Sequence, residues 1–485
     1  MRSLVLLGLI LVPVVVATKQ RTVPPARSSP WHLNLATSAN ESASTNGSFP
    51  SDADILAILK QRVEEKRSAG IVVGMLEADG RTHYVAYGDP GPGKLPLDSN
   101  TVFETGSISK VFTATLLSEL VQDGKVKLDD PVQKYLPSSV HVPSRDGKVI
   151  TLGLLSEQHS GLPRMPSNFH PANPKNPYAD YSVQQMYDFL SGYTLPRDPG
   201  QQFEYSNLGV GLLGHALALS QHKPYEDLAR EKIWQPLGMT HTAITFTPWM
   251  TEHLALGHDE KGNVTSNWDL PTFAGAGAIR STAADMLKFA AANLHADRGP
   301  LERAMSFAQQ PRDPLGPGSS IGLNWMLLQH DGDTIVWHNG GTGGYRTFLG
   351  LDHASKTAII VLTNSTGEGA DDIGFHLLNA KLPLAPKPAP AKQHTAIELP
   401  ADSLTKFVGV YALGPQLDLT VTLDNGALYV QPTGQAKLRL WPESASAFFL
   451  KEVDVQLSFA RDAAGAVTSA TLTQSGTSVP VKKIR

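Results

Sequence analysis

Two different periods of apolar residues divide the chain into a mixed N-terminal part and an alternating C-terminal part. Apolar residues recur at helical spacing from Ser51 to Val63, which predicts a helix there. Two strand-like segments follow at 71–77 and 82–87, separated by Asp79-Gly80, a dipeptide typical of tight turns. We therefore expect the folded region to begin with a helix and a β-hairpin.

A second helical pattern begins at Ser107 and stops at Gly124. The positions on its predicted inner face are Ile108, Val111, Phe112, Thr115, Leu116 and Leu120. This spacing predicts an amphipathic helix that starts at Ser107 and buries one face. Helical patterns and short strands then mix along the middle of the chain.

The pattern changes after residue 382. Residues 383–390 contain four prolines, which predicts a stiff linker, and we place it at 383–396. Beyond it, residues 417–424 alternate strictly, and Asn425-Gly426 then makes a tight turn. The segments 448–459 and 466–482 resemble this strand. Residues 397–485 are therefore predicted to form an antiparallel β domain, a small barrel or sandwich, that serves packing or assembly.

The N-terminus has the pattern of a secretory signal peptide at residues 1–17. A short basic start precedes an apolar run, and small residues offer a cleavage site. An uncleaved N-terminal anchor is the alternative. Residues 18–50 are rich in Ser, Thr, Asn and Pro and predict a disordered linker. The catalytic region is then expected at 51–382, in a protein that is exported to the periplasm or secreted.

Composition excludes several classes of function. The chain has 485 residues, 18% of them charged, with a formal net charge of −4, which does not favour nucleic acid as a partner. It has no cysteine, and therefore no disulfide and no thiolate metal site. Its histidines lack metal-ligand spacing, so we expect no metal and no cofactor. No segment after the signal peptide is apolar enough to span a membrane.

Ser107 and Lys110 form a Ser-x-x-Lys element at the start of the second predicted helix. Residues at i and i+3 share a helix face, so the amine can reach the hydroxyl. The positive end of the helix should favour the neutral amine, which could then act as a base. The alternative is an N-cap serine followed by a solvated lysine.

Two later segments could complete a serine–lysine site. Tyr205 and Asn207 precede a helix-like apolar run and could present a phenol and an amide from a loop. Residues 338–345, His-Asn-Gly-Gly-Thr-Gly-Gly-Tyr, follow a short strand predicted at 334–337. Glycines there would let a substrate backbone lie against a strand edge.

These motifs, in this order, resemble the serine β-lactamase and penicillin-binding superfamily, and its class C β-lactamase branch in particular. The flanking stretches 120–137, 159–163 and 275–289 resemble the same family. The resemblance covers roughly 51–382. It implies a mixed α/β (α+β) β-lactamase/transpeptidase-like fold, with an antiparallel sheet flanked by helices and an all-helical lobe. The C-terminal β domain resembles the barrel-like domain appended to many members.

The resemblance also implies a role for each motif residue. Ser107 would be the acylated nucleophile, Lys110 would activate it, and Tyr205 would share proton transfer to the leaving group. Asn207 would bind a substrate amide or carbonyl. His338 and Gly340, in the third motif, would bind substrate. Gly341 would bind it through its backbone N–H, and the backbone N–H groups of Gly341 and Ser107 would together form the oxyanion hole.

The third motif departs from most class C β-lactamases, which have lysine where this chain has His338. A His-x-Gly motif resembles D-alanyl-D-alanine carboxypeptidases and D-aminopeptidases of the same fold. The predicted function is therefore a serine hydrolase of D-amino-acid peptides, with small peptides, esters or β-lactams as substrates. The alternatives are a β-lactamase, a carboxylesterase, or an inactive penicillin-binding scaffold or sensor. The C-terminal β domain is a candidate for homo-oligomer formation.

Overall fold

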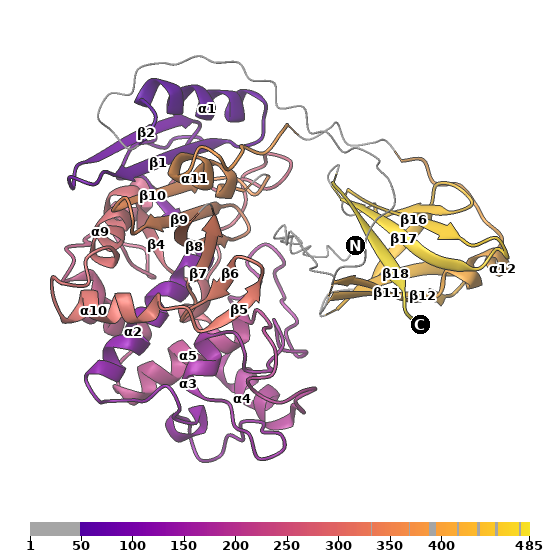
Figure 1. Cartoon of the computed structure of the whole chain (residues 1–485), viewed down its shortest axis with the longest axis horizontal. Coiled ribbons are helices and arrows are strands. Elements are labelled where there is room, and N and C mark those ends of the chain that lie inside the picture. Colours follow the sequence, from indigo (N-terminus) through magenta and orange to yellow (C-terminus); the bar gives the residue numbers. More distant parts are fainter. Residues whose placement is uncertain are drawn as a thin grey trace, which may run out of the picture. The chain divides into compact units, whose positions relative to one another are not determined.

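The computed structural model describes residues 49–330, 332–367, 369–387, 394–414, 417–433, 437–451, 454–474 and 477–485. The described chain forms two compact units that divide between Leu384 and Ala385. Figure 1 shows a mixed α/β unit followed by an all-β unit. The signal peptide predicted at 1–17, and the linker predicted at 18–50 except for its last two residues, lie outside the described residues.

The first unit is built on an antiparallel sheet of eight strands. In spatial order they are β2 (Thr82–Gly88), β1 (Gly70–Leu76), β10 (Thr357–Thr363), β9 (Arg346–Asp352), β8 (Asp333–Gly341), β7 (Met326–His330), β6 (Ser319–Ile321) and β5 (Asp313–Gly316). The hairpin predicted at 71–87 is confirmed as β1 and β2. The sequence therefore places the first two strands correctly, and β1 also pairs with the last strand of the unit, β10, which is distant in the sequence.

Helices cover both faces of this sheet, which explains why β1 and β10 are buried along their whole length. Ile71 and Val73 pack with α1 (Asp52–Glu64) and α11 (Asp371–Leu378) on one side, whereas Val72 belongs to the core on the other side. There α9 (Ala283–Asn293) lies against β1 and β10. The continuous apolar runs of these strands follow from this double cover.

Below the sheet in Figure 1 lie the helices α2 (Ser109–Gln122), α3 (Leu152–Ser156), α4 (Val183–Gly192), α5 (Asn207–Ser220) and α10 (Pro300–Ala308), which form a helical lobe. The unit also contains the shorter helices α6 (Tyr225–Ala229), α7 (Pro248–His253) and α8 (Ala274–Gly277). Eleven of the fourteen residues of α2 are buried, because α5, α8 and α10 pack around it. The prediction of one buried face was therefore wrong: α2 is a central helix.

The second unit is a closed antiparallel barrel. Its strands are β11 (Gly409–Gly414), β12 (Leu417–Asp424), β13 (Ala427–Pro432), β14 (Leu438–Pro442), β15 (Ala447–Phe449), β16 (Val455–Arg461), β17 (Val467–Gln474) and β18 (Thr477–Lys483), after a short helix α12 (Ala401–Leu404). Apolar side chains fill the interior. The predicted meander is confirmed, but 448–459 and 466–482 are each two strands rather than one.

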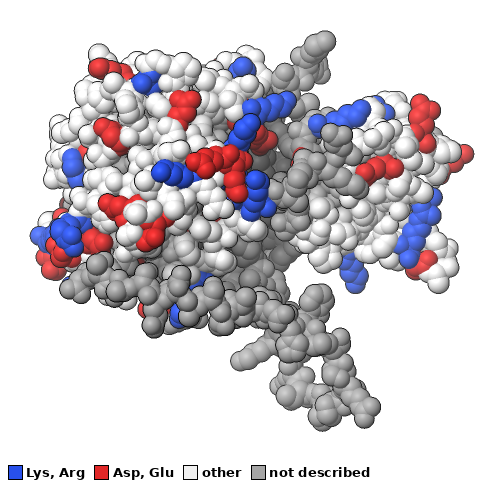
Figure 2. Space-filling model, turned by 90° about the horizontal axis from the view of Figure 1, so that it is seen from above, with Lys and Arg blue, Asp and Glu red and all other residues white. Residues whose placement is uncertain are grey.

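On the face in Figure 2, positive and negative side chains of the described residues are interspersed. Within the described ranges, no helix combines the length and the apolar character needed to cross a membrane.

Candidate active site

Ser107 lies in a 3-10 turn, Gly106–Ile108, between β3 (Val102–Glu104) and α2. Gly106 has a φ of +54°, and a Cβ there would lie 2.6 Å from the backbone nitrogen of Gly341. Glycine is therefore required both for the turn and for the close approach of β8. The helix begins at Ser109 rather than at Ser107 as predicted.

The end of β8 docks against the residue that precedes this turn. Any side chain at Gly340 would collide with the backbone oxygen of Thr105. The neighbouring strand adds a direct bond, because the Thr347 hydroxyl donates to the same oxygen over 2.9 Å. The strand predicted at 334–337 therefore continues as β8 through Gly341, and carries the third motif directly to the nucleophile turn.

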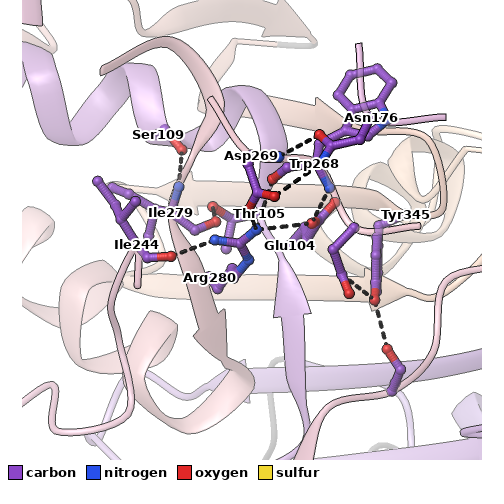
Figure 3. A network of polar contacts seen from close by, with 12 residues as sticks. Glu104, Thr105, Ser109, Asn176, Ile244, Trp268, Asp269, Ile279, Arg280 and Tyr345 are labelled. Atoms are coloured by element: carbon purple, nitrogen blue, oxygen red, sulfur yellow. Dashed lines mark hydrogen bonds and ion pairs between the residues drawn. The ribbon is translucent and has the colours of Figure 1, made fainter. Parts of the chain in front are cut away.

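A hydrogen-bond network holds the backbone on both sides of Ser107 (Figure 3). The backbone N–H and the hydroxyl of Thr105 both donate to the carbonyl of Ile279, over 3.0 and 2.8 Å. The Ile279 N–H donates to the Ser109 hydroxyl over 3.0 Å. The segment that precedes β4 (Arg280–Thr282) thus clamps both flanks of the nucleophile.

Arg280 extends this network toward the loop that carries Trp268. Its guanidinium donates to the Trp268 carbonyl over 2.7 Å, and lies 3.5 Å from the buried carboxylate of Glu104. Glu104 also accepts the Trp268 N–H over 2.8 Å, while burial raises the pKa of the Glu104 carboxyl. Sequence reasoning missed this pair, because 176 positions separate its members.

Lys110 is fully buried beside the nucleophile. Its Nζ lies 3.0 Å from Ser107 Oγ, 2.9 Å from Asn207 Oδ1 and 2.7 Å from the Ala276 carbonyl oxygen. Burial lowers the pKa of Lys110 well below its ordinary value, and the positive charge of Arg164 lowers it further. We predicted the helix N-terminus as the cause, but burial is the larger one.

The partners of Lys110 fix the orientation that its amine takes when it is neutral. The oxygens of Asn207 and Ala276 can only accept hydrogen bonds, so they take the two N–H groups of the amine. The Ser107 hydroxyl can also donate, so the remaining lone pair faces Ser107. This is the arrangement in which an amine can remove a proton from a hydroxyl.

Tyr205 and Asn207 lie at the start of α5, where Ser206 caps the helix by accepting the Gly209 N–H over 2.8 Å. The ring centroid of Tyr205 is 4.8 Å from Lys110 Nζ. Burial raises the pKa of Tyr205 to about 12, against the lowering effect of its hydrogen bond with Ser107. The tyrosine is therefore protonated near neutral pH and can donate a proton.

His338 points from β8 toward the same site, with its ring centroid 6.4 Å from that of Tyr205. Burial, and then the nearby Lys110, lower the pKa of His338 to about 3. Its Nδ1 lies 2.6 Å from the Asn339 carbonyl oxygen. The neutral histidine carries no charge for a substrate carboxylate, in keeping with the departure noted in the sequence.

Two further residues belong to the site, and sequence reasoning did not single them out. The Tyr178 hydroxyl lies 3.4 Å from Asn207 Nδ2. The Arg164 guanidinium carbon lies 5.2 Å from the ring centroid of Tyr205. Arg164 directly follows the stretch 159–163 that resembles the family, and that position is the signal that could have found it. Two aromatic residues nearby, Trp268 and Tyr345, form other contacts: the Trp268 N–H donates to Glu104 and the Tyr345 hydroxyl donates to the Ala255 carbonyl.

Comparisons with known proteins agree with this geometry. The family model described as "Beta-lactamase" matches residues 55–381, and a "Domain of unknown function" model matches 393–483. The chain is 30% identical to the D-alanyl-D-alanine-carboxypeptidase/endopeptidase AmpH of Escherichia coli over 61% of this chain and 80% of the relative. It is 26% identical to a β-lactamase of Pseudomonas fluorescens, over 66% and 96%.

Solved structures with this fold are also similar to the chain. A β-lactamase/D-alanine carboxypeptidase from Yersinia pestis, solved with citrate, has a TM-score of 0.59 at 25% identity, over 68% of this chain and 99% of that one. An octameric penicillin-binding protein homologue from Pyrococcus abyssi has a TM-score of 0.61 at 21% identity, over 89% of this chain and 100% of that one. At this identity the similarity concerns the fold only. The chain belongs to the β-lactamase family of serine hydrolases, with a β-barrel domain appended to the β-lactamase/transpeptidase fold.

Proposed function

We propose that the protein hydrolyses D-amino-acid peptides through an acyl-enzyme on Ser107. The observation that carries the proposal is the position of Lys110, whose Nζ lies 3.0 Å from Ser107 Oγ and within hydrogen-bond distance of the oxygens of Asn207 and Ala276. Burial lowers the pKa of this amine and so favours its neutral form, in which the lone pair left by the bonds to Asn207 and Ala276 faces Ser107 and can act as a general base for the hydroxyl.

The residues support a two-step acyl transfer. Lys110 takes the proton of Ser107 as Oγ forms a bond to the substrate carbonyl carbon. The backbone N–H groups of Ser107 and Gly341 would stabilise the oxyanion, since Gly341 lies against the Gly106 turn. Tyr205, protonated near neutral pH, gives a proton to the leaving amine as its bond to carbon breaks. Water then attacks the acyl carbon and gives a proton to Tyr205. Lys110 returns its proton to Ser107 Oγ as the bond between that oxygen and the acyl group breaks.

His338 and the relatives favour peptides over β-lactams. A neutral imidazole offers a β-lactam carboxylate less attraction than the lysine of most class C β-lactamases. The AmpH relative is named a D-alanyl-D-alanine carboxypeptidase/endopeptidase. β-Lactams would then acylate Ser107 and turn over poorly. A carboxylesterase or a β-lactamase uses the same groups, and an inactive scaffold or sensor is the alternative outside the enzymes.

The remaining parts of the proposal concern the chain around the site. Residues 1–17 would act as a signal peptide and direct export, and the catalytic domain would span 51–382. The linker at 383–396 would join it to the barrel at 397–485. The barrel would serve packing or homo-oligomer formation, and the name of the Pyrococcus abyssi homologue, which describes it as octameric, makes this worth testing.

A substrate panel on the purified protein tests the proposal. 4-Nitrophenyl esters, D-Ala-D-Ala peptides, D-amino amides and nitrocefin are compared in wild type and Ser107→Ala, and the acyl-enzyme is located by mass spectrometry. We expect turnover of D-peptides or short esters, lost by several powers of ten in Ser107→Ala. An acyl group on another residue would refute the nucleophile. If none of the acylating reagents labels Ser107, the inactive scaffold or sensor is favoured.

A further inference from the structure

The candidate site holds a cation that the proposed chemistry does not use. Arg164 is half-buried, and its guanidinium carbon lies 5.2 Å from the ring centroid of Tyr205. Among the residues that the structure describes, its side chain has no hydrogen bond and no ion pair. A partly buried guanidinium without an acidic partner is unusual, because burial removes water from its charge.

The backbone of Arg164 is fixed at the site. Its carbonyl oxygen accepts the N–H groups of Asn207 and Leu208, over 3.1 and 3.3 Å, at the first turn of α5. The side chain therefore starts beside Asn207, the residue that holds Lys110. An arginine on this anchor is placed by the same helix end that places the proton donor Tyr205.

The groups around Arg164 leave its positive charge unbalanced. It affects the pKa values of Lys110, Tyr178 and Tyr205, lowering each. None of these groups is an acid near neutral pH, and His338, across the site, is neutral. Among the residues that the structure describes, the site thus offers one fixed cation and no anion paired with it.

We propose that Arg164 is a specificity-determining residue that binds a carboxylate of the substrate, the charge that His338 does not supply. This inference rests on the proposed function. A guanidinium presents paired donors that match a carboxylate, and a substrate anion would complete the ion pair that the protein leaves open. The carboxylate could belong to the acyl part or to the leaving part of the substrate, and the experiment separates the two.

The test uses two matched pairs of substrates on the full-length protein. For the acyl part, mono-4-nitrophenyl glutarate is compared with its methyl ester, which lacks the charge. For the leaving part, an N-acylated D-Ala-D-Ala peptide is compared with its C-terminal amide. The variants are Arg164→Gln, which removes the charge, and Arg164→Lys, which keeps it. Arg81→Gln is the matched control, because Arg81 pairs with Asp79 in the β1–β2 turn, three strands from β8.

In Arg164→Gln, we expect kcat/KM for the charged member of one pair to fall roughly ten- to hundredfold relative to its neutral partner. Arg164→Lys should keep most of the preference, and Arg81→Gln should change nothing. Each variant is compared at the plateau of its own pH profile. Because the charge of Arg164 lowers the pKa of Lys110, its loss should also move the acidic limb to higher pH for both members.

Equal losses on the charged and neutral members of both pairs would overturn the inference, because Arg164 would then act only on Lys110 or on folding. An unchanged preference would overturn it as well. These outcomes differ from failure of the proposed function, in which the wild-type protein would release no 4-nitrophenol and take no fluorophosphonate label. That result would remove the inference together with the function on which it rests.

Discussion

Replacing Asn207 with aspartate should switch off the base without disturbing the fold. Aspartate has the shape of asparagine, but its carboxylate oxygen would lie where Oδ1 now lies, 2.9 Å from Lys110 Nζ. The pair would then bind one more proton than the wild type near neutral pH. Whether that proton sits on the amine or on the carboxyl, it occupies the lone pair that now faces Ser107.

The size of the effect follows from the geometry. Two opposite unit charges 2.9 Å apart attract by about 6 kcal/mol at an effective dielectric constant of 20. Desolvation of the new carboxylate opposes this, and we take about half, roughly 3 kcal/mol, as the net gain of the protonated pair. At about 1.4 kcal/mol per pH unit, the acidic limb of the rate profile should move up by about two units.

The assay is the pH dependence of kcat/KM for a neutral 4-nitrophenyl ester. Asn207→Asp should lose rate by up to about a hundredfold below its shifted limb and recover much of it in alkaline solution. Asn207→Ala is the control, because it removes the amide without adding a charge. It should lower the rate with little movement of the limb. If Asn207→Asp shows the same limb as the wild type, Lys110 is not the base.

Three further predictions address other parts of the chain. Tyr205→Phe should slow turnover by about 10²–10⁴-fold with the fold intact, because the proton donor is lost; steady-state rates and circular dichroism check this, and a near-normal rate would exclude the role. His338→Lys should raise kcat/KM for nitrocefin relative to a neutral ester by about tenfold, since it adds a cation for the β-lactam carboxylate; an unchanged ratio would contradict our account of the third motif. A chain ending at Leu384 should fold and keep fluorophosphonate labelling of Ser107, because the cores of the two units share no described residue; aggregation or loss of label would make the barrel part of the catalytic unit.

The sequence predicted the fold well where a period is local. The hairpin of β1 and β2 and the strand β12 were visible because their alternation and turn dipeptides act within a few residues. Breaks inside a long alternating run were not visible, so β15 and β16 were expected as one strand. The burial of α2 on all sides was also missed, because it depends on α5, α8 and α10 packing around it.

The candidate site shows the same division. The motif residues were found because the family pattern lies in short segments, and the structure brings Ser107, Lys110, Tyr205, Asn207 and His338 together. What set the pKa of Lys110 was not visible. The sequence suggested a helix end, whereas the larger causes are burial and Arg164, which come from segments far apart in the chain.

The site must satisfy two requirements that conflict electrostatically. A base beside Ser107 must be uncharged, and a receptor for a carboxylate must be charged. In this chain burial lowers the pKa of both Lys110 and His338 and so favours their uncharged forms, which makes neither of them suited to be the receptor. A guanidinium remains cationic across the pH range in which enzymes work, and Arg164 is half-buried rather than fully buried.

The charge of Arg164 also assists the base, because a nearby cation disfavours the protonated form of Lys110. A substrate carboxylate bound to Arg164 would weaken that assistance, so binding and base strength are coupled. The acidic limb of the profile should therefore lie at higher pH for kcat with a charged substrate than for kcat with its neutral partner, and Arg164→Gln should abolish that difference.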